Sequence, residues 1–189
     1  MLAVNDGASP VTITGGTAER SVLTANVGAD PDGNGAPSYQ WFRNGVAIGA
    51  ATAATYTTTA ADVGSRITVR VNYTDGQGFA ESVTSLGTNP ITAINDGASS
   101  LTITGSASVG QTLTRTIGAD PDGAGTAPTT VWLRNGVAIA GATGATYVLT
   151  AADLGATIST RISYTDGQGF AELVTSAATA VVTNVTGQI

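Results

Sequence analysis

The sequence predicts an all-β protein made of two tandem antiparallel β-sandwich domains. Three observations support this: a repeat with an offset of 90 residues, short segments that alternate apolar and polar residues, and no stretch that keeps a 3.6-residue period long enough for a helix. A unit of this length suits one small β-sandwich and is too long for one coil of a solenoid. We expect the first domain at residues 1–93 and the second at residues 94–189.

The repeat is carried by near-identical segments in the two halves of the chain. The repeated segments, with their second copies, are 5–9 (95–99), 28–33 (118–123), 43–48 (134–139) and 73–81 (164–172). One extra residue in the second copy shifts the offset to 91 after residue 123, so that Trp41 matches Trp132. The two halves are therefore expected to share one fold.

The early strands are predicted from alternation and from one turn. Leu23, Ala25 and Val27 form an apolar face with period two. In the second copy Arg115 replaces Ala25, so either Arg115 lies at a sandwich edge or the predicted register is wrong there. Asn44-Gly45 separates two apolar segments and predicts a tight hairpin, because both residues of that turn need positive φ.

The later part of each unit contains a short turn and the most regular strand. Thr59-Ala60-Ala61-Asp62 and its copy predict one short helical turn, with Asp62 and Asp153 as capping residues. Residues 66–73 then alternate strictly, with Ile67, Val69, Val71 and Tyr73 on the apolar face. We expect this strand to line the core of its sandwich.

The order of these features resembles the bacterial immunoglobulin-like repeats of large extracellular and adhesin-type proteins. The features are a Trp on the third predicted strand, the corner Ala61-Asp62-Val63-Gly64 and the turn Tyr73-Thr74-Asp75-Gly76-Gln77-Gly78, and both copies carry them. The resemblance implies a two-sheet antiparallel sandwich with a spacing or adhesive role, and similar modules occur in phage virion proteins. Because the chain has no Cys, Trp41 and Trp132 are expected to pack against aliphatic side chains.

Composition excludes several classes of protein. With no Cys and no His, the chain has no thiolate nucleophile, zinc finger, disulfide or imidazole base. A net charge of −6 disfavours nucleic-acid binding. No apolar run approaches the roughly 20 residues that span a bilayer. The start of the chain lacks a secretory signal, so Met1 begins either a fragment of a longer secreted protein or a short natural protein.

Acidic, glycine-rich loops are the feature of the sequence that most directly indicates a binding site. Asp-x-Asp-Gly-x-Gly places two carboxylates close together in each copy, and Ca²⁺ takes six to eight oxygen ligands. In an immunoglobulin-like topology, four carboxylates of each unit are expected at the end where the first strand starts, which for the second unit is the junction between domains. The predicted metal ligands are Asp6, Asp30, Asp32, Asp75, Asp96, Asp120, Asp122 and Asp166. The same sequence is also typical of an ordinary solvated β-turn.

Other residues have weaker functional interpretations. Glu81 and Glu172 either join the acidic loops or are solvated charges on an edge strand. A carbohydrate-binding role would depend on exposure of Phe79, Phe170 or Tyr39. A glycosidase with paired carboxylates is the least favoured alternative, because each copy lacks inserted loops that would build a cleft.

The expected function is a non-enzymatic structural or binding module. Low charge, Thr-rich faces and repetition suit tandem domains displayed on a bacterial cell surface or in an extracellular matrix, with Ca²⁺ as a candidate stiffener of the domain junction. The partner would be a protein or carbohydrate surface, or neighbouring copies in an assembly. The alternative is a phage capsid or tail decoration protein, located on the virion.

Overall fold

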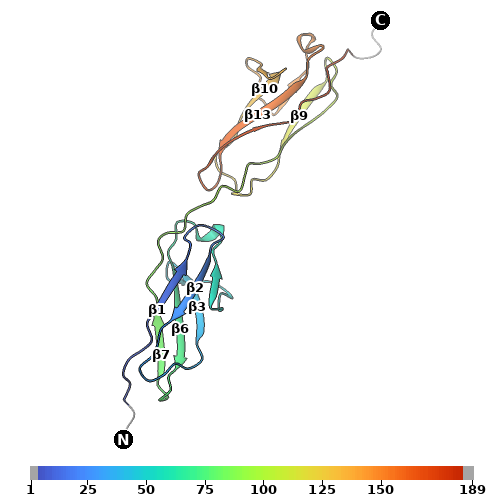
Figure 1. Cartoon of the computed structure of the whole chain (residues 1–189). Coiled ribbons are helices and arrows are strands. Elements are labelled where there is room, and N and C mark those ends of the chain that lie inside the picture. The colour runs from blue at the N-terminus through green and yellow to red at the C-terminus, as the bar shows by residue number, and fades with distance from the viewer. Residues whose placement is uncertain (1–3, 185–189) are drawn as a thin grey trace. The chain divides into compact units, whose positions relative to one another are not determined.

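The chain folds into two compact units, Met1–Ile94 (unit 1) and Asn95–Ile189 (unit 2) (Figure 1). The computed structural model describes residues 4–184. Each unit is an immunoglobulin-like antiparallel β-sandwich of two sheets, one with three strands and one with four. The fold class predicted from the sequence is therefore confirmed.

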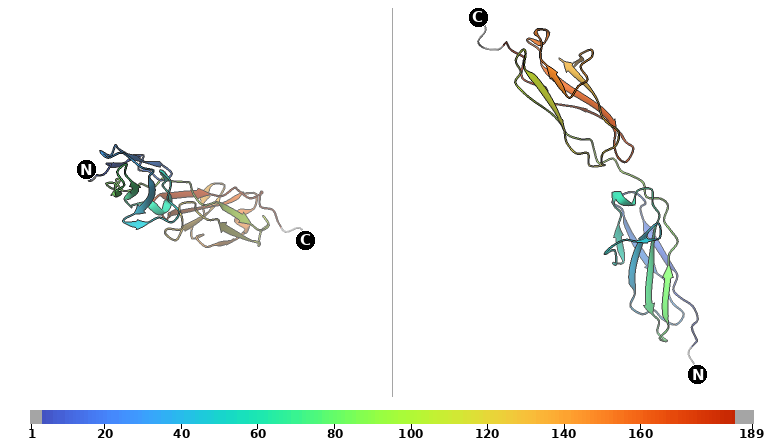
Figure 2. Two further views of the ribbon diagram at one scale, coloured as in Figure 1. Left: turned by 90° about the horizontal axis from the view of Figure 1, so that it is seen from below. Right: turned by 180° about the vertical axis from the view of Figure 1, so that it is seen from behind.

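In unit 1 the three-stranded sheet has the order β1-β2-β5, and the four-stranded sheet has the order β4-β3-β6-β7. Figure 2 shows the strands of the unit from two further directions. The elements are β1 (Val11–Gly15), β2 (Val22–Val27), β3 (Ser38–Arg43), β4 (Val46–Ala47), β5 (Thr55–Thr57), η1 (Ala60–Asp62), β6 (Ile67–Thr74) and β7 (Ala80–Thr84). The single turn η1 is the short helical turn that the sequence predicts.

Unit 2 repeats this arrangement, with sheets β12-β9-β8 and β11-β10-β13-β14. Its elements are β8 (Leu101–Thr104), β9 (Thr112–Ile117), β10 (Thr129–Arg134), β11 (Val137–Ala138), β12 (Thr146–Val148), η2 (Ala151–Asp153), β13 (Ile158–Thr165) and β14 (Ala171–Thr175). Equivalent strands pair in equivalent registers: β3 pairs with β6 and β10 pairs with β13, both antiparallel. Corresponding side chains of the two units can therefore be compared directly.

The core of each unit lies between its two sheets and is centred on the Trp. Trp41 is fully buried among Leu23, Ile67 and Val69, as the alternation predicts. Its ring centroid also lies 5.8 Å from that of Tyr56, and its Nε1 donates to the Ala53 carbonyl oxygen at 2.9 Å. The indole thus packs against an aromatic ring as well as the expected aliphatic side chains.

The predicted hairpin forms between β3 and β4. Asn44 and Gly45 have φ of 45° and 83°, and Asn135 and Gly136 in unit 2 have 49° and 81°. Positive φ at both positions matches the right-handed twist of the flanking strands. The Asn-Gly pair therefore sets the length of both hairpins.

The position of Arg115 matches neither alternative predicted from the sequence, a sandwich edge or a wrong register. It lies on β9, the central strand of its sheet, directly opposite Ile103 on β8. Its register matches that of Ala25 in unit 1, which lies opposite Ile13. The side chain is half-buried, and its Nε has no hydrogen-bond partner among the described residues. The predicted register is right, and the charge is accommodated on the central strand.

Candidate metal centre

Each unit brings three of its predicted carboxylates together. Acidic cluster 1 consists of Asp30 and Asp32, from the loop between β2 and β3, and Asp75, which follows β6. One carboxylate oxygen from each of the three lies within 4.8 Å of the others. Acidic cluster 2 is the equivalent group in unit 2, formed by Asp120, Asp122 and Asp166 with the same spacing. Hard cations select such oxygen-only sets.

The fourth predicted carboxylate of each unit lies outside its cluster. Asp6 is exposed, and its backbone N–H donates to Asp32 Oδ2 at 2.7 Å. In unit 2 the Asp96 backbone N–H donates to Asp122 Oδ2 at 2.7 Å. The loops do converge at this end of each unit, but the segment before the first strand contributes its backbone amide to the cluster. Loop proximity can be predicted from topology, whereas the direction of a side chain cannot.

The last Asp of each cluster closes a turn with one oxygen and leaves the other unpaired. Asp166 Oδ1 accepts the backbone N–H groups of Gln168 and Phe170 at 2.8 and 2.9 Å. Asp166 Oδ2 is buried and has no hydrogen-bond partner among the described residues, and Asp75 Oδ2 is in the same state. Because both side chains are more than nine-tenths buried, each oxygen has lost solvent without a replacement.

The first Asp of each cluster is fixed by a Tyr, which is buried in the core in unit 1 and half-buried in unit 2. Tyr73 donates its hydroxyl proton to Asp30 Oδ2 at 2.6 Å, and Tyr164 makes the same bond to Asp120 Oδ2. The Tyr164 hydrogen bond is the largest of the effects that lower the pKa of Asp120 below its ordinary value. The alternation predicts a core position for Tyr73 but not this contact, because the hydroxyl reaches the loops at the end of the sandwich.

The middle Asp distinguishes the two clusters. In cluster 1, Asp32 Oδ1 accepts the Gln77 side-chain N–H at 2.6 Å. In cluster 2, Asp122 Oδ1 is buried and has no hydrogen-bond partner among the described residues. Cluster 2 therefore holds two orphaned carboxylate oxygens, where cluster 1 holds one. A divalent cation could coordinate such unpaired oxygens.

The remaining candidates are the two Glu residues and three aromatic residues. Glu81 Oε1 accepts the Asn5 side-chain N–H at 2.6 Å, and Glu172 makes the same bond with Asn95. These bonds connect β7 in unit 1 and β14 in unit 2 to the segment that precedes the first strand of the same unit. Phe79 and Phe170 are half-buried, and Tyr39 packs against the core of unit 1.

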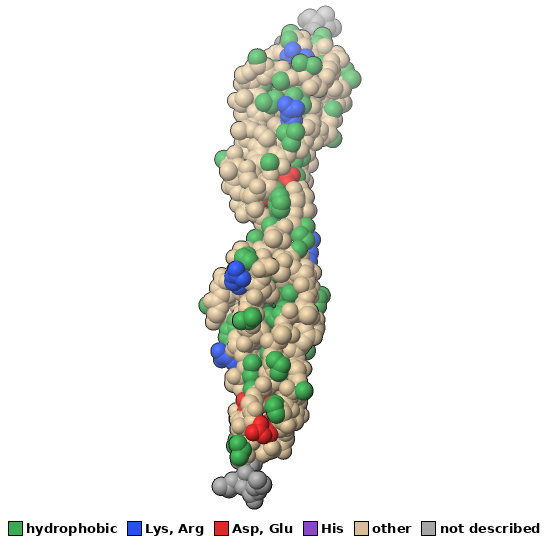
Figure 3. Space-filling model, turned by 60° about the vertical axis from the view of Figure 1, so that its left-hand side comes forward, with side chains coloured by type: hydrophobic (Ala, Val, Ile, Leu, Met, Phe, Trp, Pro, Cys, Tyr) green, Lys and Arg blue, Asp and Glu red, His purple; other side chains and the backbone are tan. Residues whose placement is uncertain are grey.

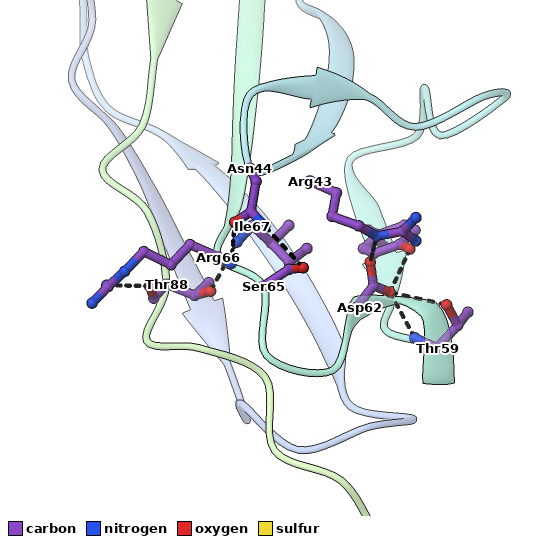
Figure 4. A network of polar contacts seen from close by, with 9 residues as sticks. Arg43, Asn44, Thr59, Asp62, Ser65, Arg66, Ile67 and Thr88 are labelled. Atoms are coloured by element: carbon purple, nitrogen blue, oxygen red, sulfur yellow. Dashed lines mark hydrogen bonds and ion pairs between the residues drawn. The ribbon is translucent and has the colours of Figure 1, made fainter. Parts of the chain in front are cut away.

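Asp62 in unit 1 and Asp153 in unit 2 each lie in a separate buried site of their own unit. Asp62 Oδ2 accepts the Thr59 backbone N–H at 2.7 Å, as a capping residue would. Arg43 approaches from the other side, and its Nε donates to Asp62 Oδ1 at 2.7 Å (Figure 4). Burial raises the pKa of Asp62, but hydrogen bonds, led by those from Tyr56 and Arg43, outweigh it and lower the pKa. The capping role was predictable from the sequence, whereas the ion pair was not.

The surface between these features carries little charge. On the face drawn in Figure 3, Asp, Glu and Arg side chains are few and scattered. Within residues 4–184 no helix is long and apolar enough to cross a membrane.

Comparisons with known proteins identify similar solved structures at low sequence identity. No protein-family model matches the chain, and no curated protein matches its sequence. The chain is similar to a Ca²⁺-stabilized adhesin that helps an Antarctic bacterium reach out and bind ice, with 14% identity over 92% of this chain and a TM-score of 0.34. It spans 49% of that adhesin chain.

Two further solved structures of tandem domains are also similar to the chain. The FN1–FN3 domains of chicken CNTN1 match 90% of this chain, which covers 67% of that structure, with 14% identity and a TM-score of 0.28. The tandem Ig repeats of Dlar match 91% of this chain, which covers 92% of that structure, with 14% identity and a TM-score of 0.28.

Proposed function

We propose that the chain is a non-enzymatic structural module of two immunoglobulin-like repeats, displayed on a bacterial cell surface or in its extracellular matrix as a spacer or adhesive element. In this proposal each unit binds one divalent cation, Ca²⁺ by its ligand chemistry, in its acidic cluster. The carrying observation is that both clusters contain buried carboxylate oxygens without hydrogen-bond partners.

The cation would supply positive charge where three carboxylates otherwise repel one another. Like charges within a few ångströms disfavour the folded loop unless a counterion offsets them. In cluster 2, Asp122 Oδ1 and Asp166 Oδ2 would be the first ligands, with Asp120 completing the carboxylate set. Six to eight oxygens are needed in total, so carbonyl groups and water would fill the remaining positions.

Cation binding in cluster 2 would also fix the segment that leads into unit 2. Asp96 donates its backbone N–H to Asp122 of the cluster, and Asn95 is bonded to Glu172 on β14, so residues 95 and 96 are already attached to unit 2. A bound ion would hold Asp122 and, through it, this segment. The role proposed for the ion is therefore to limit the freedom of the chain immediately after residue 94.

Calorimetric titration of the chain with Ca²⁺ after chelator treatment tests the proposal. We expect heat of binding and a rise in the melting temperature of both units, with tighter binding at cluster 2, because Asp122 Oδ1 is not engaged by an amide as Asp32 Oδ1 is. Asp166→Asn should remove the tighter site and Asp75→Asn the weaker one. The absence of heat and of any change in melting temperature would exclude the cation.

A second measurement tests the mechanical part of the proposal. Spin labels placed in each unit should give a narrower distribution of distances in Ca²⁺ than in chelator, and Asp166→Asn should abolish the difference. Asp75→Asn is the matched control, since cluster 1 lies in the other unit. Equal distributions with and without Ca²⁺ would leave a cation site without a stiffening role.

A further inference from the structure

Unit 2 contains an open pocket beside its long β9–β10 loop. The pocket has a volume of about 590 Å³, within the range of small-ligand sites. Its walls combine apolar side chains with a few polar groups: Ile117, Ala119, Ala124, Pro128, Ser99 and Tyr164. The backbone of Gly118 and Asp120 also lines it.

In unit 1 a side chain of the protein itself occupies the equivalent position. Asn34 Oδ1 accepts the Asp30 backbone N–H at 2.6 Å and the Ser9 hydroxyl at 3.2 Å. Its Nδ2 donates to the Gly28 carbonyl oxygen at 2.7 Å. One carboxamide thus satisfies a donor and an acceptor on the same stretch of loop backbone.

In unit 2 the carboxamide is missing, while the groups that it would contact are retained. Ala124 stands where Asn34 stands in unit 1, and both residues follow a Gly of positive φ in the same Asp-Pro-Asp-Gly turn. Gly118, Asp120 and Ser99 correspond to the three partners of Asn34. Among the described residues, nothing hydrogen-bonds the Asp120 backbone N–H or the Gly118 carbonyl oxygen.

We propose that this pocket binds a primary carboxamide, the side-chain group of a Gln or Asn presented by a partner polypeptide. The ligand carbonyl would accept from the Asp120 N–H, and the ligand N–H₂ would donate to the Gly118 carbonyl oxygen, as Asn34 does within unit 1. The Ser99 hydroxyl, which donates to Asp120 Oδ2 at 3.5 Å, would turn toward the ligand to repeat the contact of Ser9. The methylene stem of the ligand would contact the apolar wall formed by Ile117, Ala119 and Pro128.

The pocket discriminates between a carboxamide and its acid. A Glu or Asp side chain has no N–H for the Gly118 carbonyl oxygen, which would then be left unpaired. The acid would also bring a negative charge beside the Asp120 carboxylate, which lines the same pocket. An uncharged amide avoids both costs. This contact does not need a cation, so it can be tested in chelator, separately from the function proposed above.

Amide-resolved NMR titration of the 189-residue chain tests the proposal with defined probes. In chelator, acetamide and a blocked Gly-Gln-Gly peptide should give saturable shifts of the Asp120 and Ser99 amide signals. A blocked Gly-Glu-Gly peptide and N-methylacetamide should give shifts at least several-fold smaller. N-acetylglucosamine serves as the probe for a sugar ligand.

Two reciprocal variants test whether the residue at positions 34 and 124 controls binding. Ala124→Asn should fill the pocket with the side chain of unit 1 and abolish the shifts, whereas Asn34→Ala should open unit 1 and create new shifts at the Asp30 amide. Shifts that persist in Ala124→Asn, or no saturable response to acetamide and the Gln peptide, would overturn the proposal. A response to N-acetylglucosamine without one to the Gln peptide would overturn the polypeptide ligand. If Asn34→Ala does not fold, Ala124→Asn alone decides.

Discussion

In unit 2 the Nε atom of Arg134 lies 2.7 Å from Oδ1 of Asp153, a carboxylate that is completely buried. The Arg134 side chain is 32% exposed, so only one partner of this ion pair has lost its solvent. Unit 1 repeats the pair with Arg43 and Asp62 at the same distance. Because a buried charge is costly unless it is compensated, the Arg is one of the groups, with Thr and Tyr donors, that keep each Asp ionised in the fold.

Loss of the guanidinium should therefore destabilise unit 2 strongly. Arg134→Met keeps most of the aliphatic stem but leaves the fully buried Asp153 carboxylate without its cationic partner, which destabilises the fold. Denaturant unfolding followed through amide signals of unit 2 measures this change, with the signals of unit 1 as an internal reference. Arg115→Met is the matched control, because Arg115 Nε has no hydrogen-bond partner among the described residues, and this change should be neutral or stabilising. Equal losses in the two variants would contradict the assignment.

The same pair predicts how stability responds to acid. Burial opposes ionisation of Asp153, but hydrogen bonds from Thr150, Arg134 and Tyr147 together lower its pKa below the ordinary 3.8. A lowered folded-state pKa contributes stability that is complete above the unfolded-state value and is lost as pH falls through the folded-state value. The melting temperature of unit 2 should thus decline as pH falls below 3.8.

The Arg134→Met variant provides the control for this pH dependence. Without the guanidinium the folded-state pKa of Asp153 is less depressed, so the decline, which still begins near the unfolded-state pKa, should be smaller than in the unchanged chain. Thermal unfolding across a pH series, read from amide signals of unit 2, gives both curves. Declines of equal size in the two proteins would mean that Arg134 does not set the pKa of Asp153.

The period-two alternation was sufficient to predict β2 and β6 and the core residues that they carry. Ile67, Val69 and Val71 are fully buried on one face of β6, because the side chains of a strand alternate and one face must be covered. The hairpin followed from Asn44-Gly45, since few other dipeptides accept positive φ twice. These features depend on local sequence alone.

The contacts of the candidate sites depend on residues far apart in sequence and were only partly predictable. Arg43 and Asp62 are 19 residues apart, and Tyr73 and Asp30 are 43 residues apart. No periodic pattern links such residues. The exchange of Asn34 for Ala124 between otherwise matching loops was visible in the sequence. Its meaning required the hydrogen bonds of unit 1.

Trp41 should be the largest single contributor to the core of unit 1. The indole is fully buried and its Nε1 bonds to the Ala53 carbonyl oxygen at 2.9 Å, so Trp41→Ala removes both a large apolar group and a hydrogen bond. Replacement of a buried Trp by Ala costs about 3–5 kcal/mol. Urea unfolding followed by amide signals of unit 1 measures the loss. Fluorescence of Trp132 reports on unit 2 and serves as the reference. Trp41→Phe retains part of the ring and should lose less; an equal loss would mean that ring packing contributes little.

Gly35 should be required for the geometry of acidic cluster 1. A Cβ at this position would overlap the Thr74 carbonyl oxygen, and Thr74 directly precedes Asp75 of the cluster. Gly35→Ala must therefore displace the end of β6, and such overpacking costs about 1–3 kcal/mol. Thermal unfolding and Ca²⁺ titration of the variant should show a less stable unit 1 with weakened binding at cluster 1 and unchanged binding at cluster 2. Gly49→Ala is the control, because no atom lies within 4 Å of its added Cβ. If Gly35→Ala and Gly49→Ala behave alike, the backbone beside Asp75 is freer than its contacts indicate.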